Sequence, residues 1–245
     1  VGFYERYRDD LEMFRAFGHR AHRFGVEWQR IEPVDRGPNA PFDREQLAHY
    51  ADMVATCRRL GMEPIVTLQH FTLPSWLADR GGIFAPDAAA RFGRYCAAVA
   101  QALGDVKFWI TINEPNVLAT AAYLYGVFPP GEKSLVKGIQ ALGRMVHMHA
   151  AGARAVRGSA ADHGRRAYVS VAHQERPTIG AETVSDSAVA WIPDRLFNSV
   201  FIDACQRQSW DPGLLRRILG PVGPLTPGVD LLTGIEGQVP GARLD

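Results

Sequence analysis

The sequence is poor in cysteine and has almost no imbalance of charge. Its three cysteines (Cys57, Cys96 and Cys205) lie in helical patterns, which indicates buried free thiols and a reducing, cytoplasmic setting. Lysine and arginine number 27 against 26 aspartates and glutamates, so the formal net charge is +1. A chain without a basic excess has no electrostatic footprint for nucleic acid. We therefore predict no nucleic-acid partner.

Long hydrophobic runs and the common cofactor motifs are also absent. No apolar stretch approaches the length of a membrane span, so the sequence predicts no membrane partner. It contains no glycine-rich nucleotide loop, no His-Glu-x-x-His pair and no Gly-x-Ser-x-Gly elbow. We therefore predict no cofactor and no metal site. The composition, 47% hydrophobic and 22% charged, is that of a globular protein with a sizeable core.

Strand and helix patterns alternate along the chain. Short apolar runs predict buried strands at residues 21–28, 64–68, 108–112 and 167–172. Helical periodicity predicts helices at about residues 4–17, 43–60, 86–103, 135–156 and 194–207. From residue 211 the chain is rich in glycine and proline, with one short helix and no clear strand. Such alternation predicts a parallel sheet with right-handed crossovers.

Two α/β architectures fit this alternation, an open doubly wound sheet and a (β/α)8 barrel. The nucleotide fingerprint that often accompanies the open sheet is absent, and every predicted strand ends in polar residues that would meet at one mouth. These features favour the barrel. Because a barrel needs eight strands and four are clear, the predicted fold is a partial (β/α)8 barrel of the α/β class. We expect residues 1–245 to form a single incomplete barrel domain.

The strongest candidate for chemistry follows the third predicted strand. The run Phe108–Ile112 leads directly into Asn113, Glu114 and Pro115. Pro115 disfavours the helical conformation at Glu114 and ends the strand, which presents an amide and a carboxylate at its C-terminal end. Enzymes with parallel sheets keep their chemistry at that edge, so Glu114 is a candidate general acid or base. The alternative interpretation is a solvated polar turn.

Three further residues of the two preceding strands are candidates. His70 and Phe71 follow the second strand, and an imidazole beside an aromatic face suits a sugar with its hydroxyls and its C–H face. A histidine satisfied within the core is the alternative. Arg23 lies in an otherwise apolar strand, so we expect it to be buried and to meet a carboxylate inside the barrel mouth. An arginine that extends to the surface is the alternative there.

Four motifs resemble those of the family 1 glycoside hydrolases, the β-glucosidase type. Residues 21–33, Ala-His-Arg-Phe-Gly-Val-Glu-Trp-Gln-Arg-Ile-Glu-Pro, are similar to that family's second-strand signature Tyr-Arg-Phe-Ser-x-x-Trp-x-Arg-Ile. Residues 64–74 resemble its third strand, with the pair of histidine and aromatic residue. Residues 109–115, Trp-Ile-Thr-Ile-Asn-Glu-Pro, resemble its fourth strand, and residues 126–131 the loop that follows. The four occur in order and at family-like spacing.

The resemblance implies a retaining β-glycosidase that acts on small β-glycosides or oligosaccharides. In such an enzyme Glu114 is the general acid/base, and Asn113 contacts the 2-hydroxyl of the sugar. His70 binds a hydroxyl of the glycone, and Phe71 stands where the family often has tryptophan. Arg23 orients the second catalytic carboxylate, the nucleophile.

The sequence departs from the family pattern in three places. It contains no first strand with a glycone-binding glutamine, no Thr-Glu-Asn-Gly strand with the nucleophile and no final strand rich in tryptophan and glutamate. It opens at Val1 without an initiator methionine, and Asp245 falls about where a sixth strand should begin. We therefore expect a part of a longer enzyme, and we expect this part to be inactive by itself.

Two other functions stay open at this point. One is a remnant of such a barrel that binds sugars or a partner without catalysis. The other is a small α/β enzyme of unrelated chemistry that uses Glu114 and Glu175 as its pair of carboxylates. Glu175 and His173 end the fourth predicted strand and would face the same mouth, although nothing in the sequence distinguishes them from loop residues.

Overall fold

The computed structural model describes residues 2–180, 190–191, 193–210 and 237–245. The chain forms two compact units. The first lies within residues 1–113 and 152–170 and includes Asp245, and the second lies within residues 114–151 and 171–244. The prediction of one domain over residues 1–245 stays a prediction, and each unit is described by itself.

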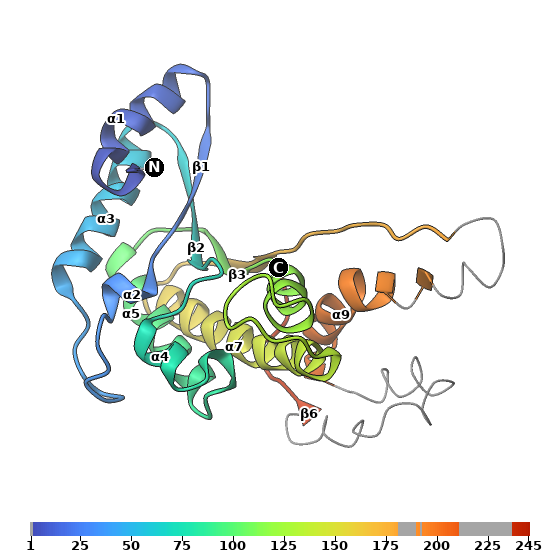
Figure 1. Cartoon of the computed structure of the whole chain (residues 1–245). Coiled ribbons are helices and arrows are strands. Elements are labelled where there is room, and N and C mark those ends of the chain that lie inside the picture. Colours follow the sequence, from blue (N-terminus) through green and yellow to red (C-terminus); the bar gives the residue numbers. More distant parts are fainter. Residues whose placement is uncertain (1, 181–189, 192, 211–236) are drawn as a thin grey trace, which may run out of the picture. The chain divides into compact units, whose positions relative to one another are not determined.

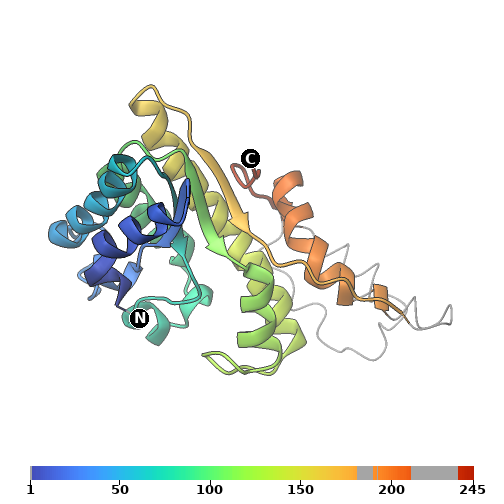
Figure 2. The same ribbon diagram turned by 90° about the horizontal axis from the view of Figure 1, so that it is seen from above.

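The larger sheet of the described structure has the strand order β1-β2-β3-β4 (Figure 1). The strands are β1 (Ala21–Gly25), β2 (Glu63–Gln69), β3 (Phe108–Asn113) and β4 (Tyr168–Ala172). β2 pairs with both β1 and β3 in parallel, which places β1 at an edge. β4 continues the sheet beyond β3, where the backbone N–H of Tyr168 donates to the carbonyl oxygen of Lys107 at 2.7 Å. Figure 2 shows β3 and β4 side by side.

Helices with well-defined ends connect these strands in the first unit. They are α1 (Phe3–Ala16), α2 (Trp28–Ile31), α3 (Arg44–Arg59), α4 (Ser75–Asp79), η1 (Gly82–Phe84) and α5 (Ala88–Leu103). The carboxylate of Asp43 caps α3 by accepting from the backbone N–H of Gln46 at 3.0 Å. α5 stops at Gly104, whose φ of 64° suits glycine. α1 packs on α3, where the Tyr4 hydroxyl donates to the Gln46 side chain at 2.6 Å.

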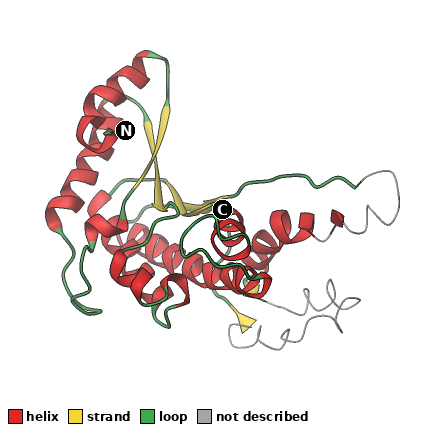
Figure 3. Cartoon of the chain, viewed as in Figure 1, coloured by secondary structure: helices red, strands yellow, loops and turns green. Residues whose placement is uncertain are grey.

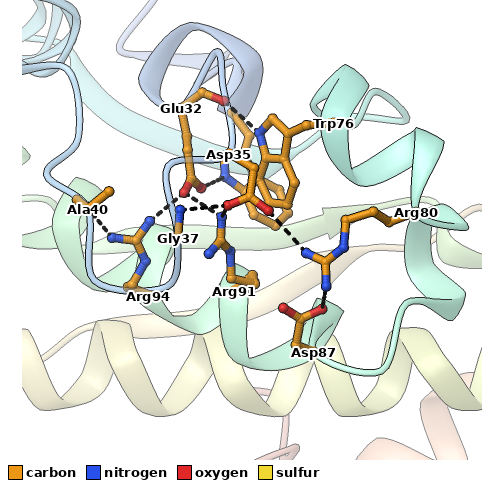
Figure 4. A network of polar contacts seen from close by, with 10 residues as sticks. Glu32, Asp35, Gly37, Ala40, Trp76, Arg80, Asp87, Arg91 and Arg94 are labelled. Atoms are coloured by element: carbon orange, nitrogen blue, oxygen red, sulfur yellow. Dashed lines mark hydrogen bonds and ion pairs between the residues drawn. The ribbon is translucent and has the colours of Figure 1, made fainter.

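A cluster of charged side chains joins the segment that follows β1 to helix α5 (Figure 4). Glu32 is 5% exposed and Arg91 is 3% exposed, and their side chains pair at 2.9 Å. Arg94 pairs with the same carboxylate oxygen of Glu32. The indole N–H of Trp28 donates to the other carboxylate oxygen at 3.0 Å, and that of Trp76 donates to the Glu32 carbonyl at 2.9 Å. Because both charges are buried and hydrogen-bonded, this cluster fixes the turn against α5.

The second unit is largely helical in its described part (Figure 3). Its elements include α6 (Pro115–Leu118), the π-helix η2 (Ala119–Leu124), η3 (Arg195–Ser199), α9 (Val200–Arg207) and the short antiparallel pair β5 (Ser209–Trp210) and β6 (Gly237–Gln238). The long helix α7 (Leu135–Asp162) begins in this unit and ends in the first. On α7, buried His149 contacts the carbonyl oxygen of Ala242 through Nε2 at 2.8 Å.

Most of the predicted elements are confirmed, with one clear error. The predicted strand at residues 21–28 is wrong in its second half, because β1 ends at Gly25 and Trp28 begins α2. The Trp28 ring stacks on the buried Tyr95 ring at 5.1 Å, and this packing turns the chain inward. The pair β5 and β6 was not predicted, and the short helix expected after residue 211 lies outside the described residues.

The three cysteines are free and buried, as predicted. Burial raises the pKa of the Cys57 thiol to about 11 and raises that of Cys205 further still. Thiols of this kind stay protonated and pack as small apolar groups. The predicted cytoplasmic location stays a prediction.

Candidate active site

In the first unit, Asn113 ends β3 and is held there by Arg23. Asn113 is 3% exposed, and Nη2 of Arg23 donates to its Oδ1. Nε of the same guanidinium donates to Oγ1 of Thr67 on β2 at 2.8 Å. Since the oxygen of the Asn113 amide faces a cation, its Nδ2 is the end that can donate to a ligand hydroxyl. The three strands β1, β2 and β3 thus share one polar cluster, which we call the Arg23 cluster (Arg23, Thr67 and Asn113).

The predicted burial of Arg23 is wrong. Its side chain is exposed, because β1 is the edge strand of the sheet and its polar face is open in the described structure. A guanidinium that keeps contact with water does not require a carboxylate partner to offset its desolvation. The contact with Asn113 gives Arg23 a role that the sequence did not indicate. Its predicted role toward a nucleophile stays a prediction.

His70 and Phe71 lie just beyond the C-terminal end of β2. His70 is exposed and Phe71 is half-buried, and their rings meet edge to face with centroids 5.1 Å apart. Phe71 has a φ of 71°, in the left-handed region that large side chains seldom adopt. An accessible imidazole beside an aromatic ring is the arrangement expected for sugar binding, and the alternative of a buried core histidine is excluded by the exposure of His70.

Gln69 is a polar residue of this region that the sequence reasoning missed. It ends β2, is 3% exposed, and its Oε1 has no hydrogen-bond partner among the described residues. The sequence did contain an indication of this residue. Thr67 and Gln69 are two positions apart on a strand, so their side chains point to the same face of the sheet. Buried side-chain oxygens normally accept a hydrogen bond, so Oε1 of Gln69 is a candidate acceptor at this strand end.

Glu114 follows Asn113 directly in the chain and belongs to the second unit. Its φ and ψ are 44° and 62°, so it lies in the left-handed region, outside the helix that Pro115 begins. The backbone N–H of Glu114 donates to the carbonyl oxygen of Ala172, the last residue of β4, at 2.6 Å. The expectation that Pro115 keeps Glu114 out of the right-handed helical region is confirmed. Strain of this kind is common where a side chain is presented for function.

Buried polar side chains surround the start of α6 in the second unit. Asn116 is 1% exposed, and its Nδ2 donates to the carbonyl oxygens of Gln174 at 2.6 Å and Phe197 at 3.0 Å. The ring of His173 contacts the Asn198 carbonyl through Nε2 at 3.0 Å. Because a carbonyl only accepts, Nε2 carries the proton.

The pKa of His173 is lowered. Burial is the largest cause and outweighs the Asn198 and Phe197 carbonyls and the carboxylates of Glu175 and Glu114, which all act to raise it. His173 is therefore a neutral group at neutral pH. Glu175 itself is exposed beyond the end of β4.

The described residues contain neither a group of side chains suited to a metal ion nor a helix suited to a membrane. Within residues 2–180, 190–191, 193–210 and 237–245, no three His, Cys, Asp or Glu side chains are grouped to hold a metal ion. None of the helices in the same ranges combines the length and the apolar character needed to cross a membrane.

Comparison with known families identifies the family of this chain. The model for glycosyl hydrolase family 1 matches residues 1–209. The chain belongs to this family. That match covers β1 to β4 and all of the candidate residues, from Arg23 to Glu175.

Two relatives are similar to the chain over more than half of its length. Thermostable beta-glucosidase B of Thermobispora bispora is 34% identical over 233 residues, which is 94% of this chain and 46% of that protein. A 6-phospho-beta-galactosidase of Lacticaseibacillus casei is 36% identical over 130 residues, 53% of this chain and 27% of that protein. The chain thus spans less than half the length of these two relatives.

A solved structure of the family shows the same fold. The family 1 β-glucosidase from Thermotoga maritima in complex with isofagomine lactam superimposes with a TM-score of 0.79 at 25% identity. The match covers 97% of this chain and 52% of that one. The prediction of a partial (β/α)8 barrel of the α/β class is confirmed, and so is the resemblance to the β-glucosidase type.

Proposed function

We propose that this chain supplies the acid/base half of a retaining β-glycosidase that hydrolyses small β-glycosides. The observation that carries the proposal is the end of β3. There Arg23 holds the Asn113 oxygen, and the next residue, Glu114, has a left-handed backbone before Pro115. Hydrolysis with retention needs one carboxyl group that first gives a proton and later takes one. Glu114 fits that role.

In this mechanism the Glu114 carboxyl protonates the glycosidic oxygen as its bond to the anomeric carbon breaks. The carboxylate then removes a proton from the water that attacks the glycosyl-enzyme intermediate. Asn113 donates through Nδ2 to the sugar 2-hydroxyl, and His70 and Phe71 bind the glycone. The nucleophile is a second carboxylate about 5–5.5 Å away, as retention requires. We expect it, with its Thr-Glu-Asn-Gly motif, in a part of the enzyme beyond these 245 residues.

The role of Glu114 is tested by a series of leaving groups. In the enzyme that contains this chain, Glu114→Gln should slow cleavage of alkyl β-glucosides by about 100- to 10,000-fold, the usual value of general acid catalysis. Glycosides with activated aryl leaving groups need little protonation, so their first step should slow far less. Glu132→Gln, on the surface, is the matched control. An equal loss for both substrate classes would contradict the proposal.

The chain by itself should not hydrolyse glycosides. The test is to purify the 245 residues and assay them with an activated aryl β-glucoside, beside the Glu114→Ala and Glu175→Gln variants. We expect no turnover at an enzymatic rate. Turnover that is lost in both variants would instead support the small enzyme that uses Glu114 and Glu175 as its pair.

The second candidate function is a remnant that binds sugars without catalysis. It is favoured by one observation, that the sugar-binding candidates His70, Phe71 and Asn113 are all present while no nucleophile motif is. Binding of a β-glucoside by the 245 residues, together with a failure of any longer form to turn it over, would support this function over the enzyme.

A further inference from the structure

The segment that carries His70 and Phe71 is tied to the turn that follows β1. We call residues 70–74, between β2 and α4, the β2–α4 loop. The Thr72 hydroxyl donates to Oε2 of Glu27 at 2.9 Å. The first residue of α4, Ser75, donates to Oε1 of Gln29 with its backbone N–H at 2.6 Å and its hydroxyl at 3.1 Å. Acceptors on the preceding turn therefore hold the loop at its middle residue and at the residue that directly follows it.

The backbone of Phe71 needs such a support. Its φ of 71° is unfavourable for an aromatic residue, and such a conformation persists only where the surroundings over-determine it. Thr72 is the next residue, so the hydrogen bond to Glu27 acts directly on the chain that leaves the strained position. We expect loss of this bond to weaken the support of the positive φ at Phe71, and a return to a negative φ would turn the rings of His70 and Phe71 away from their present positions.

The turn that supplies the acceptors is itself rigid. The Tyr50 hydroxyl accepts from the backbone N–H of Glu27 at 3.1 Å. The buried Tyr95 hydroxyl lies 2.9 Å from the Val26 carbonyl oxygen and 3.1 Å from that of Leu68, so one phenol bridges the ends of β1 and β2. Glu32 anchors the far end of the turn, as Figure 4 shows. Glu27 thus connects the loop to the helices: its backbone is hydrogen-bonded to Tyr50 of α3, and its carboxylate to Thr72 of the loop.

We propose that Glu27 is a positioning residue, whose carboxylate, acting through Thr72, holds His70 and Phe71 in the geometry that binds a sugar. The identity of the ligand, a sugar, rests on the proposed function. The positioning of the β2–α4 loop by Glu27 does not. An acceptor at position 27 and a hydroxyl at position 72 are both required. Glu27→Gln and Thr72→Ser keep this pair, whereas Glu27→Ala and Thr72→Val remove it.

The structural part is tested without a ligand. A residue with a left-handed backbone gives a strong NMR contact between its own amide and α protons, and this signal at Phe71 reports the loop. We expect the signal in the unchanged chain and in Glu27→Gln and Thr72→Ser, and its weakening in Glu27→Ala and Thr72→Val. Thr178→Val, an exposed threonine of the second unit, is the matched control. Should Glu27→Ala fail to fold, the exposed Thr72→Val decides alone. An unchanged signal there would overturn the proposal.

The functional part uses binding of methyl β-glucoside, followed at the His70 imidazole. We expect Glu27→Ala and Thr72→Val each to raise Kd about 10-fold, and the double variant to raise it no further, because both remove one contact. Glu27→Gln and Thr72→Ser should stay within a factor of two. Additive losses in the double variant would overturn the proposal. If neither the unchanged chain nor the longer enzyme that contains it binds the glycoside while the Phe71 signal behaves as expected, the proposed function fails and the positioning of the loop stands.

Discussion

Phe71 and Glu114 have the same unusual backbone and are held by different means. Each follows the end of a central strand, and each has a positive φ, 71° and 44° respectively. Phe71 depends on side chains from another turn, since Thr72 and Ser75 donate to Glu27 and Gln29. At Glu114 the next residue, Pro115, excludes the right-handed helical region, and one backbone hydrogen bond joins Glu114 to Ala172.

The difference shows which kinds of strain are specified locally. Pro115 restricts Glu114 whatever the rest of the chain does, because its ring collides with a right-handed helical residue before it. Phe71 is not followed by proline, so we expect its conformation to depend on the packing of β1, β2 and α5. The two positions should therefore respond differently to changes made far away from them.

We expect the largest effect on stability from the buried charge cluster of Glu32, Arg91 and Arg94, which lies in the same unit as Phe71. Glu32→Leu should lower the free energy of unfolding of the first unit by about 3 kcal/mol, since it leaves two arginines around a lost carboxylate. Urea denaturation, with the NMR signals of the Phe71 and Glu114 regions followed separately, measures it.

We expect Phe71 to lose its left-handed signal in that variant well before Glu114 does. The matched control is Glu132→Leu, which breaks the surface pair of Glu132 and Lys137 and should cost less than about 1 kcal/mol. Equal sensitivity of the two positions to Glu32→Leu would remove the distinction between them.

This contrast also explains how much of the molecule was readable from its sequence. The strands β2, β3 and β4 follow from local patterns and were predicted correctly, and so was the exclusion of Glu114 from the right-handed helical region. The exposure of Arg23 was not, because it depends on β1 being an edge strand. Neither was the role of Glu27, since a hydrogen bond between residues 45 positions apart leaves no local periodicity. The family resemblance names the residues that we expect to carry chemistry, but not the side chains that position them.

The next effect concerns whether Asn113 or His70 contacts the 2-hydroxyl of the sugar. Asn113→Ala in the enzyme that contains this chain should lower kcat/KM for a glucoside about 10- to 100-fold, as loss of one hydrogen bond in the transition state does. It should lower that for the 2-deoxyglucoside much less, because the partner hydroxyl is missing there. His70→Ala should affect both substrates alike. If Asn113→Ala also affects both alike, Asn113 does not contact the 2-hydroxyl.

A smaller effect is expected from glycine at the two strained positions. Glycine adopts a positive φ more readily than alanine by about 1 kcal/mol. Phe71→Gly should therefore unfold at a higher urea concentration than Phe71→Ala, and Glu114→Gly than Glu114→Ala. Comparing glycine with alanine cancels most of the packing lost with the original side chain. Equal midpoints for a pair would mean that the position carries no strain in solution.

We expect the smallest effect from pH, which should change the stability of the second unit, the unit that contains Glu114. Burial lowers the pKa of His173 below the ordinary value of 6.5, so the unfolded chain takes up a proton at a higher pH than the folded chain does. The second unit should therefore lose stability as the pH falls through 6.5 toward the folded pKa, with the carboxylates of Glu175 and Glu114 partly offsetting the loss. His173→Gln should flatten that dependence.

Burial also lowers the pKa of His22 in the first unit, so the measurement must follow each unit by its own NMR signals. His22→Phe should flatten only the response around Phe71, and His173→Gln only the response around Glu114, where the Ala172 carbonyl that holds the Glu114 N–H directly precedes His173. A loss of stability around Glu114 that survives His173→Gln would mean that another group controls the acid sensitivity of this strand end.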